Sequence, residues 1–457
     1  MTTTIQAYRF ALDPSPGQNG MLRSHCGAQR YAFNWGLGLV KANLGQRDAE
    51  RSYGVPDIEL TPPANWSAYS LRKTWNQAKD QIAPWWPANS KESYASGLAN
   101  LATALGNWHS SKAGTRRGPT IRFPRFKGKH RALSCRFTTG NLGLANADRR
   151  HVRLPRIGVV RTLESTRKLA RHVERGTARV RSATVSHRGG RWQVSFSVEI
   201  TRTDPPPTRP PSVVGVDLGI TSLAVLSTGE IVPNPKHLEL AQRELRRLQR
   251  QATRRTGPDR RTRQQPSGRW RRTQARITRL HTAVAHARRD GLHQLTTRLA
   301  SIHGTIVVED LHVAGMLKNR CLARLIAGAG WGELRRQFDY KTRRHGGRLV
   351  VADRWYPSSK TCSNCHTVKT KLRLSERMFH CDQCGFTLDR DLNAARNLAG
   401  LVSSHSWWAT VNEPDGNPRQ TRVTRAVGTA TGRPTRTPGG STPRRKTTAQ
   451  NTSRHVF

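Results

Sequence analysis

The chain has 457 residues, with 78 lysines and arginines against 29 aspartates and glutamates, which gives a formal net charge of +49. So large an excess of positive charge predicts a polyanionic partner, and nucleic acid is the obvious one. The sequence has no long apolar run and no basic helix with a continuous apolar face, so we expect no membrane partner. The length allows two to four domains. Because no signal peptide is visible, we expect a bacterial cytoplasmic protein in a reducing compartment.

The first part of the chain predicts one strand followed by helices. Residues 5–12 have the pattern of a short strand, and Ser15 with Pro16 suits the cap and the first position of a helix. We expect residues 14–112 to form a helical insert, interrupted by a Pro-Trp-Trp-Pro break at 84–87. Its aromatic residues are expected to form a core, and stacking on nucleobases is the alternative.

A short segment that follows alternates basic and aromatic residues. Residues 121–129 read IRFPRFKGK. This composition suits a nucleic-acid surface, because phosphates meet cations while rings stack on bases. An ordinary edge strand with a solvated face is the alternative. The predicted nucleic-acid contacts are Arg122, Arg125, Lys127 and Lys129.

The chain then turns to strands. Residues 192–200 alternate apolar and polar side chains, which is the period of a half-buried strand. We therefore expect residues 113–202 to form a mainly β domain that the N-terminal strand at 1–13 completes. The proline-rich stretch 203–212 predicts a linker and a domain boundary.

Two later strands end in acidic residues. Residues 213–226 read as an apolar strand, an acid, a glycine turn and a second apolar strand. Asp217 interrupts this apolar run, which is costly unless the carboxylate is paired or binds a metal. A turn aspartate is the alternative. The apolar run at 306–308 repeats the pattern, since it ends in Glu309.

Residues 238–290 hold sixteen arginines and only four acids. The leucine spacing predicts two basic helices with the segment 257–268 between them. Such a charge run is often only a solvated face. So many uncompensated arginines repel one another, however, and phosphate binding is the better interpretation. The arginines expected to bind nucleic-acid backbones are Arg246, Arg247, Arg250, Arg254, Arg271 and Arg272.

Four cysteines form the sharpest metal-binding pattern. Cys362 and Cys365 make one CxxC pair, Cys381 and Cys384 make another, and fifteen residues separate the pairs. Four thiolates can surround a zinc ion tetrahedrally, and this spacing suits a two-knuckle site. A closed four-cysteine site is structural, so we expect no catalysis there. Two disulfides are the alternative, which the expected reducing compartment disfavours. A redox CxxC is disfavoured because two pairs occur together.

Asp389 and Asp391 open a helical run that we expect over residues 392–401. An aspartate here can simply cap the helix, which is the alternative. Because strands and helices alternate along this part of the chain, one sheet can gather Asp217, Glu309 and a third acid at one point. Three carboxylates are what two divalent cations need to clamp a phosphodiester. The pattern is typical of ribonuclease H-like folds.

Three segments in order, GVDLGITSLAVLS, VVEDL and YPSSKTCSNC…FHCDQCG…DRDLNAARNL, closely resemble the TnpB proteins of bacterial insertion sequences, relatives of the type V CRISPR effectors. The resemblance covers roughly residues 1–402. It implies a multidomain α/β protein, in which a ribonuclease H-like (RuvC) nuclease domain carries a zinc-ribbon insert. A wedge β-barrel with a helical recognition insert would precede the nuclease domain. The matching catalytic acids are Asp217, Glu309 and Asp391, the last rather than Asp389, and they would hold Mg²⁺.

The resemblance also implies a domain plan. Residues 1–13 with 113–202 would form the wedge β-barrel, 14–112 the recognition domain, 203–212 the linker, 213–355 with 389–402 the nuclease domain, 356–388 the zinc-binding target-nucleic-acid-binding domain and 403–457 a disordered basic tail. The arginine-rich hairpin and the long tail depart from the family pattern, and His312 stands where the family usually has asparagine. None of these departures removes a catalytic acid.

TnpB proteins bind a guide RNA encoded at the transposon end, open double-stranded DNA beside a short flanking motif and cut both strands. They are usually named transposases, although a separate enzyme moves the element. We therefore expect an RNA-guided, Mg²⁺-dependent endodeoxyribonuclease with a structural Zn²⁺. One alternative is a zinc-stabilised nucleic-acid-binding regulator that does not cut, and another is a transposase acting on DNA ends. The sequence leaves the oligomeric state open.

Overall fold

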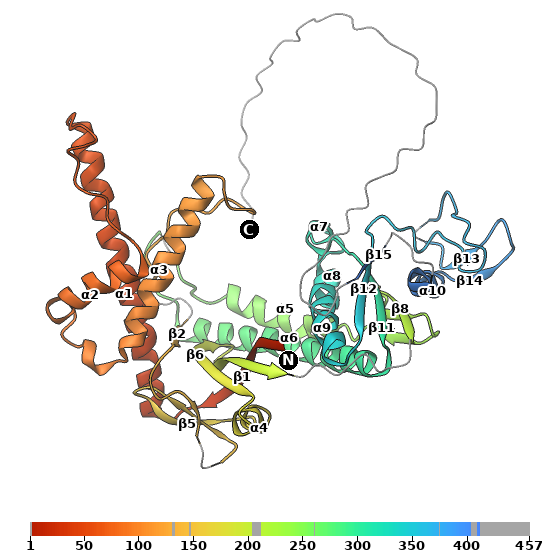
Figure 1. The fold of residues 1–457 in the computed structure, drawn as a ribbon, viewed down its shortest axis with the longest axis horizontal. Helices are drawn as coiled ribbons and strands as arrows, with labels where there is room; N and C mark the ends of the chain where they lie inside the picture. Colours follow the sequence, from red (N-terminus) through yellow and green to blue (C-terminus); the bar gives the residue numbers. More distant parts are fainter. Residues whose placement is uncertain are drawn as a thin grey trace, which may run out of the picture. The chain divides into compact units, whose positions relative to one another are not determined.

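The computed structural model describes residues 2–129, 133–145, 148–202, 212–259, 261–373, 375–403 and 409–411 (Figure 1). The expected linker lies outside the described residues except for Ser212, and so does most of the expected tail. Within that tail, Ala409–Val411 forms a strand, β15. No helix in the described part is both long and apolar enough to cross a bilayer.

Helices make up the region that the sequence predicts to be helical. They are α1 (Pro16–Ser52), α2 (Ala68–Ile82) and α3 (Lys91–Lys112), with a short 3-10 helix, η1 (Trp86–Ala88), at the Pro-Trp-Trp-Pro break. Ser15 caps α1 through a capping box with Gln18, and Pro16 stands at the first helical position, as predicted. Aromatic rings pack between the helices, for example Trp75 on Tyr94 with ring centroids 4.9 Å apart. The aromatic residues therefore form a core, as the sequence predicts.

A seven-stranded sheet is built around the N-terminal strand β1 (Thr2–Asp13). The other strands and one helix of this region are β2 (Ser134–Phe137), β3 (Gly143–Leu144), β4 (His151–Leu154), β5 (Gly158–Thr162), α4 (Arg167–Glu174), β6 (Ala178–Arg188) and β7 (Arg191–Arg202). The strand order is β2-β6-β7-β1-β5-β4-β3. Strand β1 pairs with β7 over almost its whole length, from Thr2 opposite Arg202 to Leu12 opposite Trp192. The first residues of the chain thus join strands that follow much later, and closure of this sheet into a barrel stays a prediction.

A six-stranded sheet follows, with the order β10-β9-β8-β11-β12-β15. Its strands before β15 are β8 (Val213–Asp217), β9 (Ser222–Leu226), β10 (Ile231–Pro233), β11 (Thr305–Glu309) and β12 (Arg348–Ala352). Strands β8, β9 and β10 are antiparallel neighbours, whereas β8, β11 and β12 run parallel. The carboxyl ends of β8 and β11 therefore meet at one edge of the sheet, the edge where open α/β sheets bind ligands.

Helices cover both faces of this sheet. The helices of this region are α5 (His237–Thr253), α6 (Gly268–Ile302), α7 (Val313–Met316), α8 (Ala323–Ala329), α9 (Trp331–Arg344) and α10 (Arg390–Ser403). On one face Leu299 and Phe338, from α6 and α9, share a core with the strand residues Val216 and Val308. On the other face Leu398 of α10 packs with the alternate strand residues. Because successive strand residues point to opposite faces of the sheet, the two faces have separate hydrophobic cores.

Gly215 sets how closely α10 lies on strand β8. A Cβ atom at Gly215 would stand 1.9 Å from the carbonyl oxygen of Ala395 and 2.6 Å from the backbone nitrogen of Ala399. Both obstacles are backbone atoms of α10, which cannot rotate away as a flexible side chain could. A residue with any side chain at this position would push α10 off the sheet.

We predict that Gly215→Ala lowers the melting temperature of the protein by about 5 °C, because overpacking of this kind costs about 1–3 kcal/mol. The matched control is Gly400→Ala, which lies on α10 itself at a position where a Cβ atom would have nothing within 4 Å. Alanine there should be neutral or stabilising, since it favours a helix more than glycine does. Equal melting temperatures for Gly215→Ala and the parent would contradict the close approach.

Candidate active site and metal centre

Two of the three predicted acids end adjacent parallel strands. Val216 lies opposite Val308 in the β8–β11 pair, and Asp217 and Glu309 are the next residues of the two strands. Both side chains are half-buried. The three residues before each acid are apolar and buried, so the carboxylates stand where the buried core gives way to the sheet edge.

The third acid comes from the first turn of α10. Asp389 directly precedes this helix and Asp391 is its second residue, and the two carboxylates have different partners. The Asp389 carboxylate accepts hydrogen bonds at 3.0 Å from the backbone N–H groups of Asp391 and Leu392, so Asp389 caps the helix. Asp391 is half-buried, and its charge raises the pKa of Asp217 more than the charge of the exposed Asp389 does. The capping role therefore belongs to Asp389, which leaves Asp391 for the carboxylate cluster.

The carboxylate of Asp217 is repelled by both of the other carboxylates. Burial, followed by the charges of Glu309 and Asp391, raises the pKa of Asp217 well above its usual value, and Arg390 partly opposes this. Burial also raises the pKa of Glu309. Repulsion among buried carboxylates is the electrostatic signature of a site that a cation can occupy. Two guanidinium groups provide partial compensation, because Asp391 pairs with Arg390 at 3.1 Å and with Arg377 at 4.0 Å.

A hydrogen-bond network joins this cluster to the cysteine-rich segment. The hydroxyl of Ser358 donates to a carboxylate oxygen of Glu309, 49 residues earlier in the chain. The side-chain amide of Asn397 on α10 donates to the backbone carbonyls of Ser358 and Thr361, at 2.7 and 2.6 Å. Asn393, which is fully buried, also donates to the carbonyl of Thr361 at 2.7 Å. The loop before the first CxxC pair is thus bound to Glu309 and to the helix that carries Asp391.

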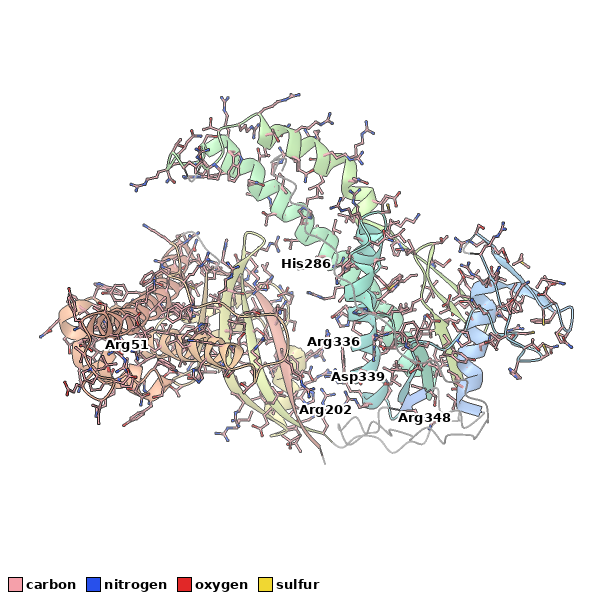
Figure 2. All side chains as sticks on the ribbon, turned by 90° about the horizontal axis from the view of Figure 1, so that it is seen from above. Arg51, Arg202, His286, Arg336, Asp339 and Arg348 are labelled. Atoms are coloured by element: carbon pink, nitrogen blue, oxygen red, sulfur yellow. The ribbon has the colours of Figure 1, made fainter. Side chains whose placement is uncertain are left out.

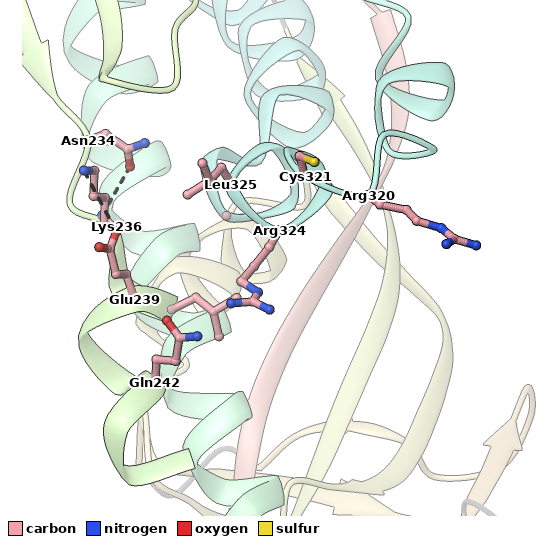
Figure 3. A pocket seen from close by; sticks show the side chains of 10 residues that line it. Asn234, Lys236, Glu239, Gln242, Arg320, Cys321, Arg324 and Leu325 are labelled. Atoms are coloured by element: carbon pink, nitrogen blue, oxygen red, sulfur yellow. Dashed lines mark hydrogen bonds and ion pairs between the residues drawn. The ribbon is translucent and has the colours of Figure 1, made fainter. Parts of the chain in front are cut away.

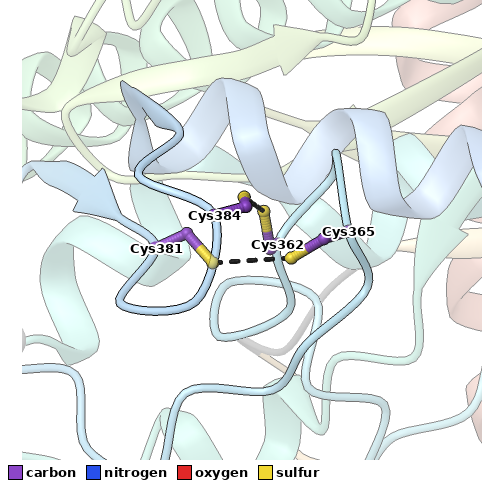
Figure 4. Close-up of side chains that lie close together, drawn as sticks. All are labelled: Cys362, Cys365, Cys381 and Cys384. Atoms are coloured by element: carbon purple, nitrogen blue, oxygen red, sulfur yellow. Dashed lines mark hydrogen bonds between the residues drawn. The ribbon is translucent and has the colours of Figure 1, made fainter.

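The four cysteines come together as predicted (Figure 4). Their sulfur atoms all lie within 4.8 Å of one another, with Cys362 and Cys384 at 3.8 Å and Cys365 and Cys381 at 3.5 Å. Tetrahedral zinc with bonds of about 2.3 Å requires sulfur–sulfur distances of about 3.8 Å, so the four thiols fit a zinc ion. Among the described residues, only these four cysteines have ligand atoms close enough together to hold a metal ion as they stand. The carboxylate oxygens of Asp217, Glu309 and Asp391 do not come that close to one another.

The segment around the cysteines has little else to hold it together. Its core consists of two cysteines and Phe379, with Cys365, Leu372 and Phe386 packed beside them. Two short strands, β13 (Met378–His380) and β14 (Thr387–Asp389), form a hairpin that leads into α10. So small a core cannot fold a segment of this length, and a metal bound to the four cysteines would stabilise it. Burial raises the pKa of Cys362 to about 11, so metal binding there displaces a proton at neutral pH.

The basic segment 121–129 surrounds an open hollow. Arg122, Arg125 and the half-exposed ring of Phe126 line a space of about 400 Å³ together with Lys41 of α1. Lys127 differs from the other predicted contacts, because its ammonium lies 3.6 Å from the ring centre of Phe33. Burial lowers the pKa of Lys127, and its backbone is paired with a side chain of α1. Lys127 therefore stabilises the segment, whereas the arginines are available to a ligand.

Helices α5 and α6 form the two basic helices that the sequence predicts, and side chains project outward along both (Figure 2). The first ends at Thr253 and the second begins at Gly268, as the expected break between them requires. The predicted phosphate-binding arginines are all exposed: Arg246, Arg247, Arg250, Arg254, Arg271 and Arg272. Arg247 also forms a bidentate pair with Glu244 at 2.7 Å.

A cavity that the sequence did not predict lies between the start of α5 and α8 (Figure 3). It has a volume of about 330 Å³ and is lined by Lys236, Arg320 and Arg324 together with Glu239 and neutral residues. Its cations come from segments more than eighty residues apart, which is why no local pattern revealed it.

Three family models match the chain. The model described as "Probable transposase" matches residues 195–320, and the one described as "Cas12f1-like, TNB domain" matches residues 331–398, which include the four cysteines and Asp391. The model described as "Helix-turn-helix domain" matches residues 1–48. In this structure those residues form strand β1 and the first part of the single helix α1.

Relatives extend over most of the chain. A protein of Mycobacterium tuberculosis (strain H37Rv) with the name "Putative RNA-guided DNA endonuclease" is 41% identical over 417 residues, 86% of each chain. InsQ of Escherichia coli K12, with the same description, is 30% identical over 88% of this chain and 93% of its own. A cryo-EM structure of a Cas12f1–sgRNA–target DNA complex aligns with 87% of this chain and 99% of that one, at 13% identity and a TM-score of 0.44.

Half-buried carboxylates at the edge of a mixed α/β sheet thus stand in one chain with four cysteines that could hold a zinc ion. At this identity and coverage, the chain belongs to the TnpB family of insertion-sequence proteins. The resemblance in the sequence motifs is thus confirmed.

We predict that Asp217→Asn stabilises the protein in the absence of added Mg²⁺, and more so at pH 8 than at pH 5. The raised pKa means that Asp217 ionises in the unfolded chain before it ionises in the folded one. The folded state therefore loses stability as the pH rises from the ordinary aspartate value through the raised pKa. Asparagine stays neutral and avoids this loss. Melting temperatures at the two pH values measure the difference.

The control for this prediction is Asp389→Asn, which keeps a good helix cap and removes an exposed charge. Among the causes that raise the pKa of Asp217, the charge of Asp389 is the smallest, so its removal should have little effect on that carboxyl. Asp389→Asn should change the pH dependence of the melting temperature far less than Asp217→Asn does. A stability gain for Asp217→Asn that is equal at pH 5 and pH 8 would contradict the electrostatic account.

Proposed function

We propose that this chain is an RNA-guided DNA endonuclease that cuts by a Mg²⁺-dependent mechanism. The observation that carries the proposal is the electrostatic coupling of Asp217 to Glu309 and Asp391, each supplied by a different element, in a chain whose relatives bear that name. The sheet order β10-β9-β8-β11-β12, with three antiparallel strands followed by two parallel ones, supports a ribonuclease H-like nuclease fold.

The three carboxylates would hold Mg²⁺, since hard oxygen ligands are what this ion prefers. Bound Mg²⁺ supplies an activated water and stabilises the leaving oxygen of a phosphodiester. The chain's own residues prepare this site. Ser358 orients the Glu309 carboxylate, Asp389 fixes the first turn of α10, and Arg390 and Arg377 compensate part of the charge on Asp391.

The proposed domain plan assigns residues 213–355 and 389–402 to the nuclease domain and 356–388 to the zinc-binding domain. The four cysteines would hold Zn²⁺ as a structural ion. Residues 1–13 with 113–202 would form the wedge domain and 14–112 the recognition domain. In this plan a guide RNA reads the target DNA by base pairing, while the protein binds the backbones and a short flanking motif.

The exposed arginines support the nucleic-acid partners. Arg246, Arg250, Arg254, Arg271 and Arg272 lie on two packed helices, and in this plan they contact phosphates rather than bases. Arg122 and Arg125, beside the ring of Phe126, would add a second contact. Neutralising phosphates releases counterions, so affinity for nucleic acid should fall steeply as salt rises.

The direct test is guided cleavage. We predict that the full chain, expressed with its own genomic flank, copurifies with a discrete RNA. With Mg²⁺ the complex should cut a plasmid that matches the guide and leave an unmatched plasmid intact. Asp217→Ala should abolish cutting while the RNA remains bound. Target binding without cutting by the unmutated protein would identify the non-cleaving regulator, and the lack of any bound RNA would overturn guided recognition.

A matched pair of substitutions tests the choice between the two acids of the DxD motif. We predict that Asp391→Asn lowers the cleavage rate by at least about 100-fold, because it removes a metal ligand from the site. Asp389→Asn should retain most of the rate, since asparagine caps a helix about as well as aspartate. Single-turnover rates on the matching plasmid give both values, and the opposite ranking would place the third ligand at Asp389.

A further inference from the structure

Trp355 is exposed to an extent that no other described tryptophan approaches. Its side chain is 81% exposed. Every other tryptophan in the described part is at least half-buried or, like Trp85, packs edge-on against a tyrosine. Trp355 takes part in none of the ring pairs or cation–ring contacts found in the described residues. The full face of an indole is therefore presented to solvent.

The backbone that carries this ring is held on both sides. The preceding Arg354 donates to the Asp310 carboxylate at 2.6 Å and to the Asp310 carbonyl at 3.3 Å. The following Tyr356 packs against the core beneath α10. The backbone N–H of Trp355 donates a hydrogen bond to the Asp353 carboxylate at 2.8 Å. The exposed ring thus stands on a fixed turn rather than on a loose loop.

This turn lies beside the carboxylate cluster. Arg354 is bound to Asp310, the residue directly after Glu309, and Ser358 is bound to Glu309 itself. Three residues of chain reach at most about 11 Å, so Trp355 lies within that distance of Ser358 along the backbone.

We propose that Trp355 is a stacking site for a nucleobase of the DNA strand that enters the carboxylate cluster. Aromatic side chains bind single strands because every base offers a π-face. A base inside a duplex has both faces covered by its neighbours, so the occupant is an unstacked nucleotide. The site takes any base, since stacking reads no hydrogen-bond edge. This role for Trp355 rests on the proposed function, to which it adds a contact that positions the strand to be cut.

The arrangement of charge selects nucleic acid as the occupant. The acidic neighbours of the turn are engaged, with Asp310 paired to Arg335 and Arg354. Arg377 and Arg390 stand beside Asp391 at the same cluster. Arginines at the carboxylate cluster, and an exposed indole three residues before Ser358, match a strand whose phosphates and bases alternate.

The test uses the full chain, purified with its RNA, in an Asp217→Ala background so that bound DNA stays intact. The probe is a short single-stranded oligodeoxynucleotide with 2-aminopurine at successive positions around the expected cut. Stacking on Trp355 should quench one or two neighbouring positions. Trp355→Ala should remove that quenching and weaken binding by about 5- to 100-fold. Trp355→Phe should restore most of both, whereas a merely structural role would not depend on an aromatic ring.

Tyr53→Ala is the matched control, since Tyr53 is another exposed aromatic residue, 88% exposed, at the end of α1. It should change neither quenching nor affinity. Zinc content and melting temperature show whether Trp355→Ala folds. Unchanged quenching and affinity in a folded Trp355→Ala variant would overturn the proposal, as would quenching of an RNA probe of the same sequence when the DNA probe is not quenched. Quenching by the parent without any cleavage in the presence of Mg²⁺ would support the stack and overturn the nuclease function instead.

Discussion

The contact between Gly215 and the backbone of α10 determines where the acids can meet. Strands β8 and β11 are parallel neighbours, so their last residues, Asp217 and Glu309, lie at one edge without further help. The third acid comes from a helix that begins more than eighty residues later, and its approach depends on the missing side chain at Gly215. The register between β8 and β11 brings Asp217 and Glu309 together, and the close packing of α10 on β8 brings Asp391 toward them.

The cysteine segment then acts as a support for the same helix. Asn393 and Asn397 bind the loop before Cys362, and Ser358 in that loop reaches Glu309. A metal held by the cysteines would therefore stabilise more than its own small core. It would hold the loop that orients one carboxylate and rests on the helix carrying another. Through these contacts, a closed metal site at the cysteines would support the carboxylate cluster without taking part in the chemistry proposed there.

The sequence revealed the parts that depend on local pattern. Apolar runs that end in Asp217 and Glu309, the paired cysteines and the helix expected over 392–401 all rest on residues close together in the chain. It did not reveal Ser358 or the two asparagines, whose partners are 30 to 49 residues away. The sequence did hold one signal for this contact: Asn393 and Asn397 are four residues apart and so lie on one face of the helix, where both can bind the same loop. The distinction between Asp389 and Asp391 came from family resemblance, and the capping bonds of Asp389 now give it a physical reason.

The central claim is that Asp217, Glu309 and Asp391 hold divalent cations. The most direct measurement is anomalous diffraction from crystals of the zinc-loaded protein with its nucleic acids, with Mn²⁺ in place of Mg²⁺. The account predicts manganese between the three carboxylates, separate from the zinc signal at the four cysteines. Ordered carboxylates with no manganese among them would contradict it.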